Sequence, residues 1–299
     1  MQRSKEIAGV RVDFGLSYKE VLSKIDGYIN SDRNHFVWTI NPEFVMDAQK
    51  DTSFQALLNE SSLSLPDGAG LLYANKYLED ASTLKHDLLF PFRAFVYGTK
   101  FGFGSLAREI KLGERITGAD LMYKICENAA DKGQTVLFLG GWEKDSWGRM
   151  LPESGNVSQR AADVLKGKYP KLNVVAANSD FKRGEEDDKK TLAFIHNAMK
   201  EQELEKIDII FVAYNHIHQE KWIKRNIKKI PASVGIGIGG SFDYIVGTQH
   251  RSPEGFMRRN LEWLYRLFTQ PWRMKRILKA FPVFPLFVYY LSVTEDLQP

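Results

Sequence analysis

The sequence predicts an α/β protein in which helices cover both faces of a mostly parallel sheet. Short apolar runs alternate along the chain with longer segments of helical periodicity. The short runs are rich in β-branched residues and apolar on both sides, which is typical of parallel strands buried between two helix layers. A length of 299 residues is sufficient for one large domain with a full-sized core.

The expected strands and helices follow one another in order. Strands are expected at residues 36–40, 62–65, 135–139, 173–176, 207–213 and 234–238. Helices are expected at residues 43–58, 69–78, 119–132, 157–168, 185–203 and 219–228. Ligands of such sheets lie beyond the carboxyl ends of the strands. Polar residues and glycines occupy those positions here, which fits a nucleotide or sugar site.

Two stretches stand apart from this alternation. Residues 79–113 are aromatic-rich and show no clear period, so they are expected to be an insertion that packs on the core or touches lipid. The domain boundary is placed at 250, with an α/β core before it and a basic, amphipathic helical appendage at 251–299. Residues 251–279 carry eight basic and two acidic side chains, +6 against +4 for the whole chain. That asymmetry predicts an anionic partner: phosphates, nucleic acid or anionic lipid.

The end of the chain and its beginning both bear on localisation. The apolar run at 280–293 covers 14 residues and contains two prolines. A membrane-spanning helix needs about 20 apolar residues, so this run is expected to lie at a membrane interface or to dock on protein. The first residues do not resemble a signal peptide, and the one cysteine, Cys126, excludes an internal disulfide. A cytoplasmic protein on the inner face of the cell membrane is expected.

Several familiar signatures are absent from the sequence. It contains no phosphate-binding GxxxxGK[ST] loop, and the glycines at 235–240 do not have GxGxxG spacing. No DxD pair is present to hold a metal ion on a sugar nucleotide. His216 and His218 have no evident partners for a metal site and are expected to face solvent. No metal and no cofactor are therefore expected.

Seven short blocks occur in order between about Val37 and Arg276. They are TxN at 39–41, LPDGxG at 65–70, ERITGxDL at 114–121, LFLGG at 137–141, QEKWI at 219–223, GGSFD at 239–243 and EWLYRL at 262–267. Each block by itself is weak evidence for any one protein family. The ordered set resembles the WecG/TagA/CpsF family of inverting glycosyltransferases.

The resemblance implies a Rossmann-like core and a metal-independent reaction. Members transfer N-acetylmannosamine or a related sugar from a UDP-sugar to an undecaprenyl-diphosphate-linked sugar, in the synthesis of teichoic acid or other surface polysaccharides. It implies that Asp67 is the general base and that appendage arginines Arg266, Arg273 and Arg276 are catalytic. The substrate-binding positions are Thr39, Asn41, Arg115, Gln219, Gly140, Gly240, Ser241 and Asp243.

General chemistry favours the same roles. Inversion is a single displacement, so the acceptor hydroxyl needs a base such as Asp67 on one face of the sugar. The UDP leaving group gains negative charge in the transition state, and without a metal that charge needs fixed cations. Arginine is suited to this because its planar fork binds phosphate oxygens bidentately.

The sequence departs from the family at two places, and other functions stay open. Residues 214–218, Tyr-Asn-His-Ile-His, replace the usual Gly-Ala-Pro-Lys before Gln219, and the 79–113 segment is longer than the family norm. A catalytically silent homologue that binds nucleotide sugars is one alternative. A nucleic-acid-binding protein is another, although the tail aromatics recur at helical spacing, which favours packing over base stacking. Self-association as a homo-oligomer is left open.

Overall fold

The computed structural model describes residues 3–107, 116–143, 149, 151, 155–259 and 261–294. Six strands form one parallel sheet in the order β4-β3-β8-β7-β5-β6. Their bounds are β3 His35–Ile40, β4 Leu63–Pro66, β5 Thr135–Gly140, β6 Asn173–Asn178, β7 Ile207–Ala213 and β8 Ala232–Gly237. The expected α/β fold and all six expected strands are confirmed.

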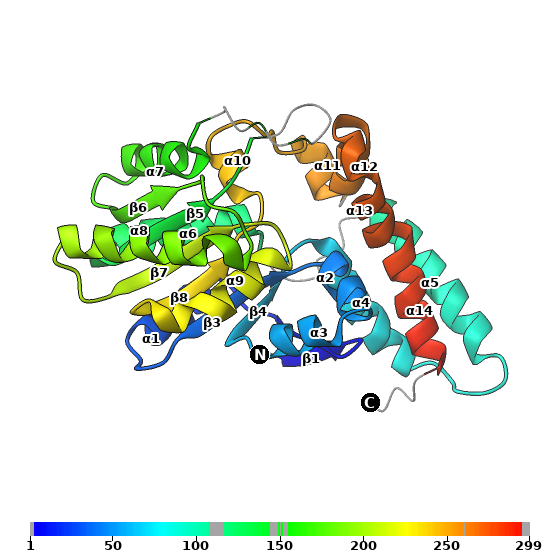
Figure 1. Ribbon diagram of the computed structural model, residues 1–299. Coiled ribbons are helices and arrows are strands. Elements are labelled where there is room, and N and C mark those ends of the chain that lie inside the picture. The colour runs from blue at the N-terminus through cyan, green and yellow to red at the C-terminus, as the bar shows by residue number, and fades with distance from the viewer. Residues whose placement is uncertain are drawn as a thin grey trace.

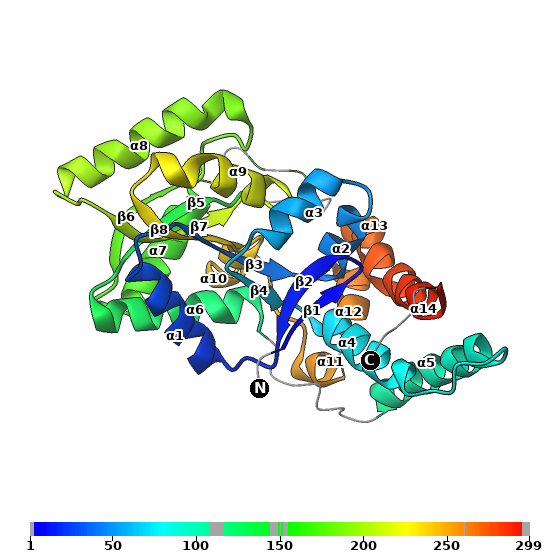
Figure 2. The ribbon, with the colours of Figure 1, turned by 90° about the horizontal axis from the view of Figure 1, so that it is seen from below.

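Helices cover both faces of this sheet (Figures 1 and 2). The first face is covered by α1 Tyr18–Ile29, α6 Gly118–Lys132 and α7 Val157–Lys168, and the second by α3 Thr52–Asn59, α8 Asp188–Glu201 and α9 His218–Asn226. Successive strand side chains point to opposite faces. Val37 and Phe138 accordingly pack in the core of the first layer, and their neighbours Trp38 and Leu137 in the core of the second.

An N-terminal hairpin, β1 Arg3–Ile7 and β2 Val10–Phe14, was not expected from the sequence. Its two-residue turn has positive φ at both Ala8 (52°) and Gly9 (73°). Alanine is unusual in such a turn, which favours asparagine or glycine, so the turn signal was weak. The Asp13 carboxylate accepts a hydrogen bond from Ser64 N at 2.8 Å. The hairpin therefore provides a hydrogen-bond acceptor for a backbone N–H on the outer edge of β4, the edge strand of the sheet.

One of the expected helices is two helices in the structure. The segment expected as 43–58 forms α2 Pro42–Ala48 and α3, separated at residues 49–51. Asp51 accepts a hydrogen bond from Phe54 N and so caps the second helix. That cap gives the chain a new helix start in the middle of a continuous apolar pattern.

The aromatic-rich insertion, of which residues 79–107 are described and 108–113 are not, is largely helical, although its sequence shows no clear period. Helix α4 runs from Ala69 to Ser82, and α5 spans Phe90–Ala107. Apolar residues occur on all sides of α5, and glycines interrupt them. A helix that is apolar all round shows no amphipathic period, so the sequence pattern gave no indication of it.

The C-terminal segment folds back along α4 and α5 (Figure 1). It comprises α11 Glu254–Arg258, α12 Glu262–Thr269, a 3₁₀ turn at Pro271–Arg273, α13 Met274–Leu278, a π turn at Lys279–Val283 and α14 Phe284–Thr294. Phe284 and Val288 are buried, and the hydroxyls of Tyr77 and Ser292 lie 3.0 Å apart. Docking on protein, one of the two expected placements of the apolar run, is thus observed.

This tail is longer as a helical segment than its apolar run suggested. Among the described residues, Pro271–Thr294 is the one helical stretch of 24 residues that is long and apolar enough to cross a membrane by length and composition. The apolar run of 14 residues is shorter than this stretch, because the basic segment 271–279 before it is helical as well. The backbone kinks at Phe281, where φ and ψ are non-helical.

Candidate functional site

A cavity of about 550 Å³ opens beyond the carboxyl ends of β3 and β4. Its lining includes Asn41 and Asp67 from the core together with Arg266, Arg273 and Arg276 from the C-terminal segment. The structure therefore brings together five of the predicted site residues that are up to 235 positions apart (41 to 276) in the chain.

Asp67 is held at the sheet edge by the turn between β4 and α4. The strand ends at Pro66, and Asp67 N donates to the carbonyl of Ile40 at 2.6 Å. Gly68 follows with φ of +90°, a backbone conformation that residues other than glycine rarely adopt. This turn lets α4 start at Ala69 and leaves the half-buried Asp67 side chain at the cavity.

Asn41 holds a comparable position at the end of β3. Its side-chain oxygen caps α2 by accepting hydrogen bonds from Glu43 N at 2.9 Å and Phe44 N at 3.3 Å. The cap orients the start of α2, whose first turn lines the cavity. Asn41 therefore has a structural role as well as its place in the lining.

The three arginines come from separate helical pieces. Spacings of seven and three residues would put the three on one face of a continuous helix. However, α12 ends at Thr269 and the backbone turns at Gln270 (φ −136°, ψ 64°). Arg266 lies on α12, Arg273 in the 3₁₀ turn and Arg276 on α13. Their convergence therefore depends on tertiary packing.

Each arginine has a different environment. Arg266 Nη2 donates to the Tyr244 hydroxyl at 2.9 Å and also pairs with Glu262. Arg276 is bound bidentately to Glu43, with Nη2 at 2.7 Å from Oε2 and Nε at 2.8 Å from Oε1. Tyr244 belongs to α10 (Ser241–Ile245), so the appendage is tied to the core by both of these contacts.

The charges in this cavity influence one another. Burial, followed by repulsion from Arg266 and Arg276, lowers the pKa of Arg273 to about 10. Burial also opposes the charge of Arg266, but Tyr244, Glu262 and Asp67 outweigh it, so its pKa is raised. Arg266 and Arg273 are thus both protonated at neutral pH, and Asp67 lies within electrostatic reach of Arg266.

A second group of predicted residues lies further along the sheet edge, outside the lining of this cavity. Thr39 Oγ1 donates to the Gly237 carbonyl at 3.2 Å, and Ser241 Oγ donates to the Ile238 carbonyl at 2.6 Å. Gln219 Oε1 accepts from Gly239 N at 2.9 Å. These hydrogen bonds hold the carboxyl end of β3 and the start of the helix after β7 against the carboxyl end of β8.

The remaining predicted positions differ in what surrounds them. Asp243 is buried near Gly240, and its charge acts on Arg273, which links this group to the arginines. Gly140 has φ of +83°, and a Cβ there would lie 2.5 Å from the Tyr214 ring. Close packing therefore requires glycine at 140. Arg115 lies outside the described residues.

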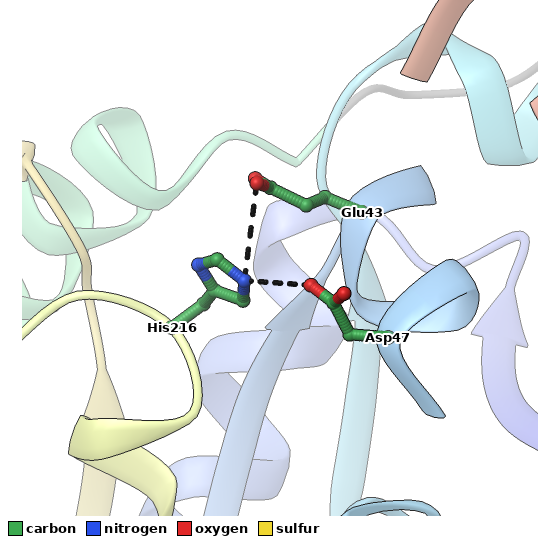
Figure 3. A group of neighbouring side chains, drawn as sticks. All are labelled: Glu43, Asp47 and His216. Atoms are coloured by element: carbon green, nitrogen blue, oxygen red, sulfur yellow. Dashed lines mark hydrogen bonds and ion pairs between the residues drawn. The ribbon is translucent and has the colours of Figure 1, made fainter. Parts of the chain in front are cut away.

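Glu43, Asp47 and His216 form a cluster that the sequence argument missed (Figure 3). His216 Nε2 lies 2.9 Å from Asp47 Oδ2 and 3.9 Å from Glu43 Oε1. The expectation that His216 faces solvent without partners is wrong, because the 214–218 loop packs against α2. The signal available in the sequence was that Glu43 and Asp47 are four residues apart in the predicted helix, so that their carboxylates share one face.

The cluster has the donor types of a metal site but is already ion-paired. Glu43 is bound by Arg276, and Asp47 accepts a hydrogen bond from Lys279 Nζ at 2.6 Å. Burial opposes the charge of Asp47, yet the hydrogen bonds from Lys279 and His216 outweigh it and lower its pKa. Histidine with two carboxylates is a set that zinc accepts, but an ion would have to displace these two cations.

Glu220, beside Gln219, is fully buried. Its Oε1 accepts from Gln219 Nε2 at 2.6 Å, while Oε2 has no hydrogen-bond partner among the described residues. Burial raises the pKa of Glu220 to about 7. Its carboxyl group therefore holds Gln219 in place and retains its proton well above the ordinary range.

The replacement Glu220→Gln is expected to flatten the pH dependence of stability. Between pH of about 4.5 and 7 the folded state holds a proton that the unfolded state has lost, so stability falls as pH rises. The loss across this window is on the order of 3 kcal/mol. Urea unfolding from pH 4.5 to 8 measures it, with the exposed Glu127→Gln as the control. Parallel profiles for wild type and E220Q would contradict the assignment.

The chain matches known glycosyltransferases over most of its length. The model of the Glycosyl transferase WecG/TagA/CpsF family matches residues 5–88 and 103–296. An N-acetylglucosaminyldiphosphoundecaprenol N-acetyl-beta-D-mannosaminyltransferase of Bacillus subtilis (strain 168) is 30% identical over 251 residues, 84% of this chain and 78% of the relative. An enzyme of the same name from Staphylococcus aureus (strain MRSA252) is 28% identical over 85% of this chain and 79% of its own length. Another, from Bacillus spizizenii, is 24% identical over 84% of this chain and 77% of its own length.

These matches confirm the resemblance found in the sequence motifs. They also leave residues 89–102 outside the family model, in agreement with the inference that the aromatic-rich segment is longer than the family norm. The cavity with its carboxylate and three arginines lies within the matched residues. The chain belongs to the WecG/TagA/CpsF family of glycosyltransferases.

Proposed function

We propose that this enzyme transfers N-acetylmannosamine or a related sugar from UDP to an undecaprenyl-diphosphate-linked sugar, with inversion and without a metal ion. The observation that carries the proposal is the lining of one cavity by Asp67 and by Arg266, Arg273 and Arg276. The names of the relatives support a lipid-linked N-acetylglucosamine acceptor. The reaction belongs to teichoic acid or other surface polysaccharide synthesis.

The geometry supports a single displacement. The Asp67 carboxylate takes the proton of the acceptor hydroxyl while that oxygen bonds to the anomeric carbon of the donor sugar. The bond from that carbon to the UDP oxygen breaks, and its electron pair leaves with the diphosphate. The three guanidinium groups stabilise the charge on the leaving group. The nucleotide extends toward Thr39, Gln219 and Ser241.

The appendage supports a peripheral position on the inner face of the membrane. Large apolar side chains are exposed on α5, α14 and the segment before α5, among them Leu88, Phe92, Leu286 and Tyr290. The basic residues of 251–279 add attraction to anionic lipid of about 1 kcal/mol for each lysine or arginine near the surface. Together they position the cavity at the surface that holds a lipid acceptor.

Transfer is expected to continue in excess EDTA with no added divalent ion. The measurement is mass spectrometry of products from a panel of UDP-sugars and a polyprenyl-diphosphate-N-acetylglucosamine acceptor, with and without EDTA. A complete loss restored by Mg²⁺ or Mn²⁺ would contradict metal independence. In that case Asp47→Asn and His216→Ala would test whether the ion binds the cluster of Glu43, Asp47 and His216. No product from any UDP-sugar would overturn the proposed function.

A further inference from the structure

We propose that α4, α5 and α14 form a groove for the isoprenoid chain of the lipid acceptor, leading away from Asp67. This inference rests on the proposed function and names the part of the acceptor that the groove holds. The groove is the apolar part of the cavity that contains Asp67 and the arginines.

The cavity is polar at one end and apolar at the other. Beyond Asp67 and the arginines, side chains of α4, α5 and α14 form its walls. They include Tyr77 of α4, Phe95 and Phe103 of α5, and Leu286 and Tyr289 of α14. On α5 the lining residues include positions 94, 98 and 102, which are four apart and share one helix face. On that face Gly98 packs closely against the Tyr77 ring, and Gly102 has open space beside it.

This polarity fits an acceptor with a polar head and a hydrocarbon tail. At the polar end Asp67 meets the hydroxyl of the acceptor sugar beside the arginines that bind UDP, and the aromatic and aliphatic walls complement the methyl-branched hydrocarbon behind that sugar. A cavity of about 550 Å³ has the size of a small-molecule site. It therefore holds the head group and the first isoprene units, and the rest of the chain must leave it.

The exit is marked by exposed apolar side chains. Phe95, Phe103 and Leu286 line the cavity and are at the same time 50%, 70% and 56% exposed. A hydrocarbon chain that passes them enters a bilayer without crossing water. A partner protein helix fits less well, because the groove is continuous with the charged end that holds Asp67.

The α5 wall of the groove lies largely outside the match to the family model. Residues 89–102, which include most of α5, lie outside the match to the family model, whereas α4 and α14 lie inside it. Tyr289 of α14 stacks edge-on against Phe95 with ring centroids 5.6 Å apart. The unmatched segment thus completes one wall of a cavity whose α4 and α14 walls lie within the match.

Gly102→Phe tests the groove, and Gly104→Phe is the matched control. A Cβ at either glycine meets no described atom within 4 Å, so neither backbone position by itself obstructs a side chain. Gly102 lines the cavity and Gly104 does not. At about 100° per residue the two positions point to nearly opposite sides of α5. G102F therefore fills the groove, and G104F leaves it open.

G102F is expected to raise KM at least tenfold for an undecaprenyl-diphosphate-N-acetylglucosamine acceptor. With an acceptor analogue that carries a methyl group in place of the isoprenoid, KM is expected to be unchanged, as is KM for the UDP-sugar. G104F should behave as wild type with both acceptors. Phe95→Ser, at a half-exposed position with little risk to folding, should weaken binding of the long-chain acceptor without affecting the short one.

The outcomes separate this inference from the function on which it rests. If the wild type transfers no sugar to either acceptor, the proposed function fails. If it transfers sugar but long and short acceptors have equal KM, the groove proposal is overturned and the function stands. Equal effects of G102F and G104F on the long acceptor would also overturn it. Calorimetry with the long acceptor in detergent provides a binding readout independent of turnover.

Discussion

The replacement Asp67→Asn is expected to lower kcat by about 10²–10⁴-fold, the usual cost of removing a general base. Asparagine keeps the shape of the side chain, so the turn at Gly68 and the binding of UDP should be preserved. The loss should therefore appear in kcat, with the dissociation constant of UDP from calorimetry unchanged. Single-turnover assays with a water-soluble acceptor measure the chemical step.

Two other carboxylates in the described lining of the cavity provide the comparison. Glu43 is paired with Arg276 and Glu262 with Arg266, so each already neutralises a cation. Glu43→Gln and Glu262→Gln should therefore retain much more of kcat than D67N. If E43Q abolished turnover while D67N remained near the wild-type rate, the base would be Glu43 and the assignment of Asp67 would be wrong.

The replacement Arg273→Ala is expected to lower kcat by about 10²–10³-fold, the scale found for a lost transition-state donor. Arg273 is the arginine whose charge is most opposed, because burial and repulsion from Arg266 and Arg276 lower its pKa. A diphosphate between the three relieves that repulsion, most strongly when the leaving group gains charge. The fall in kcat should therefore exceed any rise in KM for the donor. Arg273→Lys keeps the charge without the fork and should recover only part of the rate.

The membrane role of the tail is separated from catalysis by the choice of acceptor and control. Turnover is measured on a short, water-soluble acceptor without membranes, and binding by flotation with anionic and neutral liposomes. The exposed Lys275→Ala, on the same tail, should weaken flotation with anionic liposomes and leave kcat as in wild type. Unchanged kcat in R273A, R266A and R276A, together with weaker flotation, would assign these arginines to lipid alone.

Local pattern was sufficient for the sheet and for the place of Asp67. Buried parallel strands are short apolar runs, and their ends are marked by polar residues and glycines. Asp67 could be predicted at a strand end because Pro66 and Gly68 flank it. The ordered motifs identified the family, since spacing between blocks is kept wherever the same elements are folded in the same order.

Tertiary structure alone decided how the site is closed. Arg276 meets Glu43 across 233 residues, Tyr77 meets Ser292 across 215, and His216 meets Asp47 across 169. Helix and strand periodicity relates residues only a few positions apart, so it cannot predict such contacts. The helix in the aromatic insertion likewise escaped prediction, because α5 is apolar on every side. Only packing against α4 and α14 determines which of its faces lines the cavity, and that contact brings a hydrophobic wall next to the charged end of the site.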